Sequence, residues 1–158
     1  MTDHDEKFMM RAVELARQGM NANAGGPFGC VVVKGGQVVG EGSNRVTSTN
    51  DPTAHAEVVA IRNACQTLGT FHLDGCTIYT SCEPCPMCLG AIYWSRPAAV
   101  FFASTQEDAA AAGFDDERFY SELAKPNDKR ELYMVNLLRE EAQKVFQAWI
   151  EKPDKTKY

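Results

Sequence analysis

The sequence predicts an α/β fold of three layers, with helices on both faces of a single five-stranded mixed sheet. Short apolar segments rich in β-branched residues alternate along the chain with longer segments of helical periodicity. The first two short segments are separated only by Gly35-Gly36, which predicts an antiparallel hairpin. Strands that alternate with helices after such a hairpin indicate one sheet covered on both faces.

The first half of the chain predicts the order helix, strand, strand, helix. Apolar residues at helical spacing predict a helix over about residues 5–19, and three consecutive valines predict a buried strand over 28–34. The returning strand of the hairpin covers 37–44. Asp51 is suited to cap a helix that begins with a proline and covers 52–68.

The second half predicts three further strands and four helical segments. The strands are expected at 75–80, 99–103 and 131–135. The helical segments are expected at 86–94, 107–112, 119–123 and 138–151. No repeat or composition break divides the 158 residues, so we expect a single domain with 152–158 as a polar C-terminal tail.

Composition limits the possible partners and compartments. The formal net charge is −5 and the sequence pI is about 5.2, which argues against a broad surface for nucleic-acid phosphates. No apolar run approaches membrane-spanning length, and the polar, acidic first residues do not resemble a secretory signal. We therefore expect a cytoplasmic protein with no membrane contact.

The cysteines indicate a metal site rather than a disulfide framework. Three of the six cysteines lie within residues 82–88, whereas disulfides of a small domain are usually spread along the chain. Cys85 and Cys88 are three residues apart at the start of a predicted helix, so their sulfurs share one face. The positive N-terminal end of a helix favours the thiolate form that binds a soft divalent ion.

His55 and Glu57 complete a pattern of known chemistry. His55-Ala56-Glu57 followed by Pro84-Cys85-Pro86-Met87-Cys88 matches the H-x-E and P-C-x-x-C signature of zinc deaminases. Three protein ligands leave the fourth tetrahedral position of zinc open for a water, whose pKa falls toward about 7. Glu57 is then suited to take a proton from that water and pass it to the substrate.

Two features of this pattern require a test. In an ideal helix His55 and Glu57 point about 200° apart, so His55 must lie in a terminal or irregular turn for both to reach one site. Cys82 offers an alternative, because His55 with Cys82, Cys85 and Cys88 would make a closed structural zinc site without hydrolysis.

Beyond these motifs the chain resembles the cytidine deaminase superfamily, and within it the small bacterial guanine deaminases. The resemblance covers nearly the whole length and is carried by five segments. These are Gly25-Gly26-Pro27-Phe28-Gly29, the stretch 50–57, the stretch 80–88, Ala112-Gly113-Phe114-Asp115-Asp116, and the end of the chain at Tyr158. The first three segments also occur in tRNA adenosine deaminases, so the last two are what point to guanine.

The resemblance implies a complete set of site residues. One zinc per subunit would be held by His55, Cys85 and Cys88, with a catalytic water as the fourth ligand. Glu57 and Asp116 would be catalytic, and the purine would be contacted by Phe28, Asn44, Trp94, Asp116 and Tyr158. The resemblance also implies a homodimer in which the C-terminal segment is exchanged and caps the site.

The same residues also have plain structural interpretations. Phe28 and Trp94 are of residue types that more often belong to a core than contact a ligand, and Asn44 is typical of a strand end. Asp116 could lie in a solvated loop, and a polar tail such as 152–158 is usually frayed.

The function expected from the resemblance is hydrolytic deamination of guanine to xanthine and ammonia. The alternatives are a tRNA adenosine deaminase, a deaminase of cytosine or another amino-substituted heterocycle, and a non-catalytic zinc-stabilised domain. A basic rim and an open mouth would favour tRNA. Indifference to the loss of the Glu57 carboxylate would favour the non-catalytic domain.

Overall fold

The computed structural model describes residues 3–114 and 116–158. Two compact units follow one another along the chain, the first ending at Glu117 and the second spanning Arg118–Tyr158. The first unit contains α1 (Asp3–Asn21), β1 (Gly29–Lys34), β2 (Gln37–Ser43), α2 (Val46–Thr49), α3 (Ala56–Leu68), β3 (Cys76–Cys82), α4 (Pro86–Ser95), β4 (Ala99–Ser104) and α5 (Gln106–Ala111). α6 (Asp116–Leu123) begins two residues before the second unit, which also holds a short 3-10 turn (Asn127–Lys129) and α7 (Arg139–Glu151).

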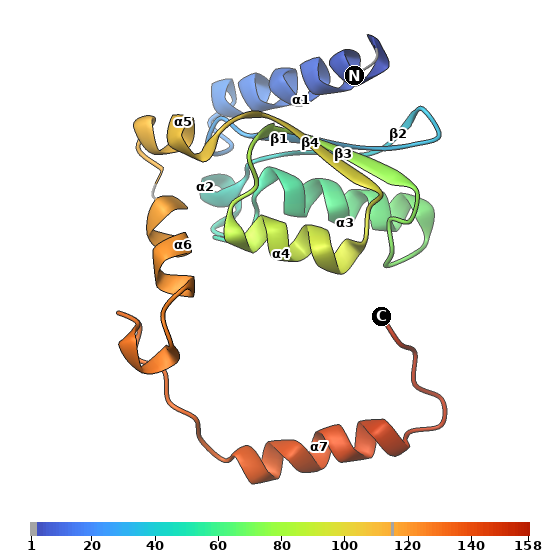
Figure 1. The fold of residues 1–158 in the computed structure, drawn as a ribbon. Coiled ribbons are helices and arrows are strands. Elements are labelled where there is room, and N and C mark those ends of the chain that lie inside the picture. The colour runs from blue at the N-terminus through green and yellow to red at the C-terminus, as the bar shows by residue number, and fades with distance from the viewer. Residues whose placement is uncertain (1–2, 115) are drawn as a thin grey trace. The chain divides into compact units, whose positions relative to one another are not determined.

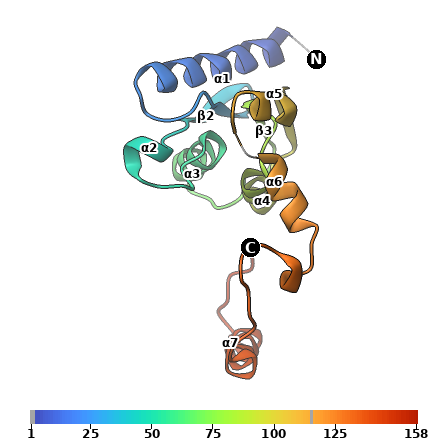
Figure 2. The ribbon, with the colours of Figure 1, turned by 90° about the vertical axis from the view of Figure 1, so that its left-hand side faces the viewer.

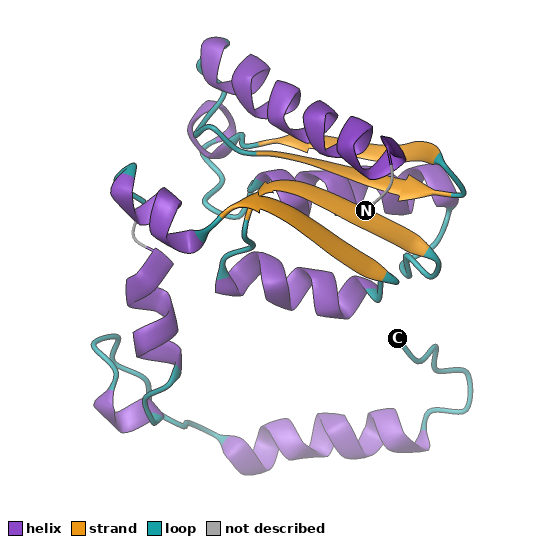
Figure 3. Cartoon of the chain, turned by 45° about the horizontal axis from the view of Figure 1, so that its top comes forward, coloured by secondary structure: helices purple, strands orange, loops and turns teal. Residues whose placement is uncertain are grey.

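The sheet of the first unit is mixed, with the strand order β2-β1-β3-β4 (Figure 3). β1 pairs antiparallel with both β2 and β3, and β3 pairs parallel with β4. The hairpin and the mixed character are confirmed, but the prediction of five strands is wrong for the described residues. Residues 131–135 form no strand. Tyr133 there is 89% exposed, and strand propensity takes effect only where a neighbouring strand offers hydrogen bonds.

The sheet of the first unit is covered on both faces, as the three-layer prediction requires. α1 lies on one face, and α3 and α4 lie side by side on the other (Figures 1 and 2). The consecutive valines of β1 divide between the two cores: Val31 packs with Phe8 and Ala12 of α1, whereas Val32 packs with Ala60 of α3. An all-apolar strand is therefore explained by burial on both faces.

The helix predicted from residue 52 begins four residues later, at Ala56. The side chain of Asp51 does not cap that helix. Its Oδ1 accepts hydrogen bonds from the backbone N–H and the hydroxyl of Thr53, at 2.8 and 2.7 Å, which holds this segment as a turn. The chain consequently reaches His55 in an extended conformation.

α3 packs unusually closely against β2 because the contact consists of small residues. A Cβ atom added to Gly42 would lie 2.3 Å from the carbonyl oxygen of Ala56, and one added to Gly40 would lie 2.5 Å from that of Ala60. Ala56, Ala60 and Ala64 are all fully buried at this contact. This contact leaves no room for a methyl group on Gly40 or Gly42, so it fixes the distance between α3 and the sheet.

The helix predicted at 138–151 is confirmed as α7, and the turn predicted at 119–123 belongs to the longer α6. Neither helix contains a buried residue among those the structure describes. Within residues 3–114 and 116–158, no helix combines the length and the apolar character that crossing a membrane requires.

Gly42→Ala is expected to destabilise the protein by about 1–3 kcal/mol, since the added methyl group must displace the backbone of α3. Denaturant unfolding measures the change. The matched control is Gly90→Ala, because Gly90 lies in α4 with open space around it and should gain about 0.5–1 kcal/mol. Equal stability of the two variants would contradict the packing constraint at β2.

Candidate metal centre and adjoining cavity

The candidate metal centre lies where α3 and α4 begin. His55 is the N-cap residue of α3, with φ −68° and ψ 154°. Cys85 is the N-cap residue of α4, with φ −63° and ψ 166°, and Pro86 occupies the first turn. Because His55 precedes the helical turn, its side chain and that of Glu57 are not held on opposite sides of a helix. The requirement stated for these two residues is therefore met.

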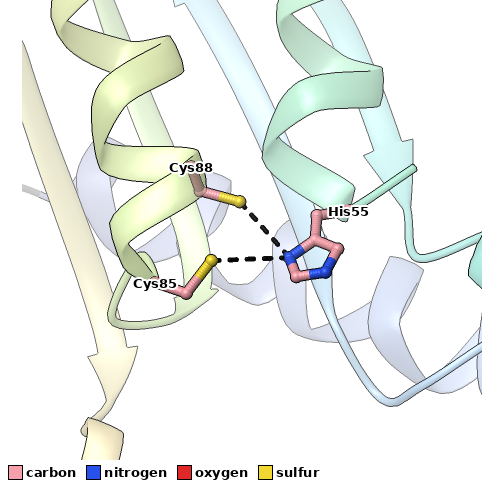
Figure 4. Close-up of side chains that lie close together, drawn as sticks. All are labelled: His55, Cys85 and Cys88. Carbon is pink, nitrogen blue, oxygen red and sulfur yellow. Dashed lines mark hydrogen bonds between the residues drawn. The ribbon is translucent and has the colours of Figure 1, made fainter. Parts of the chain in front are cut away.

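The three predicted ligand atoms converge on one point (Figure 4). Nδ1 of His55 lies 3.6 Å from Sγ of Cys85 and 3.4 Å from Sγ of Cys88. All three donor atoms lie within 4.8 Å of one another. The residues come from two segments about thirty positions apart, and the close contact of α3 with α4 joins them.

The donor set fits zinc. A nitrogen about 2.1 Å and a sulfur about 2.3 Å from one tetrahedral ion lie roughly 3.6 Å apart, which agrees with the separations above. One imidazole and two thiolates also suit a borderline-soft cation. These three residues would hold the ion and leave its fourth position for a non-protein ligand.

The two sulfurs cannot easily ionise together without a cation. The hydrogen bond from Cys88, followed by that from His55, lowers the pKa of Cys85 to about 4. The hydrogen bond to Cys85, together with burial, raises the pKa of Cys88. The pair therefore favours a single thiolate, and a bound dication would draw off the second proton because metal ligation needs the deprotonated form.

Cys82 stands apart from this group. It ends β3, it is buried, and its Sγ donates to the backbone carbonyl of Thr105 at 3.6 Å. Among the described residues, the group whose donor atoms could hold a metal ion is His55, Cys85 and Cys88 without Cys82. Burial raises the pKa of Cys82 to about 11, as expected of a thiol outside a metal site. The geometry disfavours the closed four-ligand alternative.

Glu57 is a buried carboxyl group near the metal centre. It lies in the first turn of α3 and is 6% exposed. Burial is the main cause that raises its pKa above the ordinary value for glutamate. A raised pKa makes this carboxylate a stronger proton acceptor than an exposed glutamate, which suits a group that takes up a proton and passes it on.

His55, Glu57 and Cys85 line a partly open cavity of about 230 Å³, all of whose lining residues belong to the first unit. Phe28, Asn44 and Asp116 line it as well, so the structure brings together most of the residues predicted for the site. The complete lining is Gly26, Phe28, Asn44, Val46, Thr47, His55, Glu57, Cys82, Glu83, Cys85, Phe114 and Asp116.

Two of the residues predicted to contact the purine are not part of this lining. Trp94 lies near the end of α4 and is 65% exposed. Tyr158 belongs to the second unit. Their roles in binding stay predictions.

Asn44 is held in one orientation by the backbone around it. Its Oδ1 accepts hydrogen bonds from the N–H groups of Gly26 and Val46, both at 3.2 Å. A Cβ atom on Gly25 would lie 2.2 Å from that oxygen, so only glycine permits this contact. Because the oxygen is engaged by two donors, the amide nitrogen of Asn44 is the group left to donate to a ligand.

Two aromatic rings form an apolar part of the cavity wall. Phe28 and Phe114 pack edge to face with their centroids 4.7 Å apart, and both line the cavity. A Cβ atom on Gly26 would lie within 3.2 Å of both rings, so this glycine also leaves room for the aromatic pair. A planar heterocycle could therefore be bound against an aromatic face.

The sequence interpretation assigned no role to Glu83 and none to Phe114 individually. Glu83 stands directly before Pro84-Cys85, and Phe114 follows a glycine in the loop already noted. Position beside a motif was the only available signal, since neither residue type indicates a site by itself.

The comparison with protein families supports this geometry. The model for the cytidine and deoxycytidylate deaminase zinc-binding region matches residues 2–104, which include all three donor residues and Glu57. The chain belongs to the cytidine and deoxycytidylate deaminase family. Within this deaminase family, guanine deaminase from Bacillus subtilis is 56% identical over 153 residues, which are 97% of this chain and 98% of that protein.

Solved structures of this deaminase family extend the comparison. The crystal structure of guanine deaminase from Bacillus subtilis matches with a TM-score of 0.95 and 54% identity, covering 100% of this chain and 99% of that one. A structure solved in complex with 2,6-diaminopurine matches with a TM-score of 0.68 and 36% identity, covering 71% and 62% of the two chains. A tRNA-specific adenosine deaminase from Haemophilus influenzae is 39% identical over 123 residues, or 73% of this chain and 69% of that protein.

Cys82→Ala is expected to leave the zinc content unchanged, because this thiol bonds to a backbone carbonyl outside the donor group. Metal analysis after dialysis measures the content. Cys88→Ala is the matched control and should lose most of its zinc. A cobalt-substituted Cys82→Ala protein whose thiolate-to-metal absorption falls by one thiolate would refute the three-ligand assignment.

Proposed function

We propose that this deaminase hydrolyses guanine to xanthine and ammonia with one zinc ion per subunit. The observation that carries the proposal is a three-ligand donor set, of which His55 and Cys85 line one small cavity together with the buried carboxyl group of Glu57. A non-catalytic zinc domain would give neither the carboxyl group nor the cavity a role. The 56% identity to a guanine deaminase over nearly the whole chain supports guanine as the substrate.

The reaction requires proton transfers that Glu57 is suited to make. When bound, zinc supplies Lewis acidity, which lowers the pKa of a water toward about 7. Glu57 takes a proton from the water that attacks the amino-bearing ring carbon. It passes that proton to the neighbouring ring nitrogen and assists the second transfer, by which the amino group leaves as ammonia. Burial of Glu57 supports this role because its pKa is raised.

The remaining cavity residues supply recognition of the base. We assign Phe28 to stacking on the purine and the amide nitrogen of Asn44 to donation to an acceptor on the purine edge. Asp116, which lines the same cavity, is assigned to the purine N–H groups and to the proton path of the departing amine. The assignments of Asn44 and Asp116 each pair a donor with an acceptor, so a base lacking these groups would leave polar atoms of the cavity unpaired.

The cavity suits a single heterocyclic base, and the charge of the chain favours a free base over one within RNA. About 230 Å³ is smaller than the roughly 300–1,000 Å³ of pockets for drug-sized ligands. The formal net charge of −5 also lacks the basic character expected of a tRNA-binding surface. The match to a tRNA adenosine deaminase therefore supports a shared mechanism rather than a shared substrate.

We further propose a cytoplasmic homodimer. All six cysteines are free thiols, which suits a reducing compartment. α7 leaves a row of apolar side chains without cover, namely Val145, Phe146, Trp149 and Ile150. The Phe146 side chain is 71% exposed. A contiguous exposed apolar surface of this kind usually marks a contact with another chain. We assign it to a second copy, with an exchanged C-terminal segment whose residues 152–158 close the site.

The zinc-loaded protein is expected to release ammonia from guanine faster than from adenine, cytosine, guanosine or cytidine. A coupled ammonia assay over these five compounds tests this order. Activity restricted to cytosine or adenine would replace the substrate and leave the mechanism intact.

Glu57→Gln is the control for that assay, since it removes the proton carrier and keeps the shape. We expect turnover to fall by roughly 10²–10⁴-fold. Zinc content should remain that of the unsubstituted protein. Full turnover in this variant would contradict the proton-transfer role. If the unsubstituted protein releases no ammonia from any of the five compounds, the protein is better explained as a non-catalytic zinc domain.

A mixed dimer tests the exchanged segment. One subunit carries Glu57→Gln and the other carries Tyr158→Ala, with different tags so that the heterodimer can be isolated. If the tail is exchanged, the Glu57-containing site receives the intact Tyr158, and about half of the unsubstituted activity should return. Activity no higher than half that of the Tyr158→Ala homodimer would show that each subunit closes its own site.

A further inference from the structure

Glu83 connects two segments that meet beside the cavity. It follows β3 and precedes Pro84-Cys85, and its side chain is part of the cavity lining. The backbone N–H of Glu83 donates to the carbonyl of Ser104 at 2.8 Å. Its carboxylate Oε2 accepts from the backbone N–H of Gln106 at 3.1 Å. One residue therefore holds the β4–α5 junction on both sides of Thr105.

The capping residues of α5 provide no acceptor for the backbone N–H of Gln106, which donates to Glu83. Thr105 and Asp108 form a capping box, in which Thr105 Oγ1 accepts from the N–H of Asp108 and Asp108 Oδ2 accepts from that of Thr105. Gln106 is the first helical residue, and its N–H has no partner within a helix of this geometry. Glu83 supplies the acceptor from 23 positions earlier in the chain.

The position of α5 determines the position of the Phe114 ring. The N–H of Phe114 donates to the carbonyl of Ala109 at 3.1 Å, and that of Gly113 donates to Ala110 at 3.0 Å. α5 has only six residues, so a shift at its start is carried to its end. The ring of Phe114 then packs on Phe28 in the cavity wall.

We propose that Glu83 is a positioning residue that anchors α5 to the metal-bearing loop and thereby places the aromatic wall of the cavity. Glu83 acts through Gln106 and Phe114, not on the substrate. Cys82 adds a second contact of the same kind through its bond to the Thr105 carbonyl. Only the kinetic readout of this inference rests on the proposed function, because the placement of α5 can be measured without turnover.

The test compares Glu83→Ala, Glu83→Gln and Glu107→Gln in the full-length zinc-loaded protein. Glu83→Ala should speed amide hydrogen exchange over residues 106–114 by about tenfold and raise KM for guanine by a similar factor. Zinc content should not change, and kcat should change by less than about threefold. Glu83→Gln keeps an acceptor oxygen and should stay within about twofold of the unsubstituted protein. Glu107→Gln removes an exposed charge from the same helical turn but keeps an oxygen that can accept from the Thr105 side chain, so it should change neither measurement.

Gln106→Pro tests the contact from the other side. It removes the donated N–H while proline is well tolerated at the first helical position, and the extended Thr105 before it is compatible with proline. Its exchange and KM should match those of Glu83→Ala, and the double variant should show no further change.

Several results would overturn the inference. Unchanged exchange in both Glu83→Ala and Gln106→Pro would show that the bond does not hold α5. Glu83→Gln as impaired as Glu83→Ala would show that the charge acts on the substrate directly. Loss of zinc would place the role in the metal loop. A protein that binds zinc but leaves guanine intact would refute the proposed function, and the exchange data would still decide the role of Glu83.

Discussion

The close approach of α3 to β2 is the constraint on which the site depends. Gly40 and Gly42 face Ala56 and Ala60 at distances that exclude any larger side chain. The C-terminal ends of β2, β3 and β4 lie beside the N-terminal end of β1, as the strand pairing shows. With α3 pressed onto the sheet, its first turn comes within bonding distance of the first turn of α4. Packing of small residues therefore fixes the position of the candidate metal ligands at the N-terminal end of α3.

The extended residues before the two helices convert this packing into a metal site. N-cap residues lie outside the helical turn, so the side chains of His55 and Cys85 can turn toward each other while their helices run on. Glu57, already inside the first turn, keeps a separate direction into the cavity. The proposed ligand His55 and the proposed proton carrier Glu57, only two positions apart, can serve one site because a helix begins between them.

The sequence predicted well what depends on local pattern and specific chemistry. Periodicity located α1 and α7, and ligand chemistry brought His55, Cys85 and Cys88 together. The sequence-based prediction failed where the structure depends on specific hydrogen bonds or on residues distant in the chain. The start of α3 was misplaced because the Asp51 side chain bonds within its own turn instead of capping a helix. The strand expected at 131–135 needed a neighbouring edge. Glu83 was overlooked because its partner lies 23 positions away.

The charged residues around the cavity restrict the kind of substrate more than the fold does. The described residues that line the cavity include the carboxyl groups of Glu57, Glu83 and Asp116, whereas none is a lysine or an arginine. A phosphate brought into this site would meet like charge and no cationic side chain, at a cost that low dielectric increases. Two thiolates would balance a bound dication, so the metal leaves little net positive charge for an anion. A neutral base fits this field better than a nucleotide, whose phosphate would be repelled by these carboxyl groups.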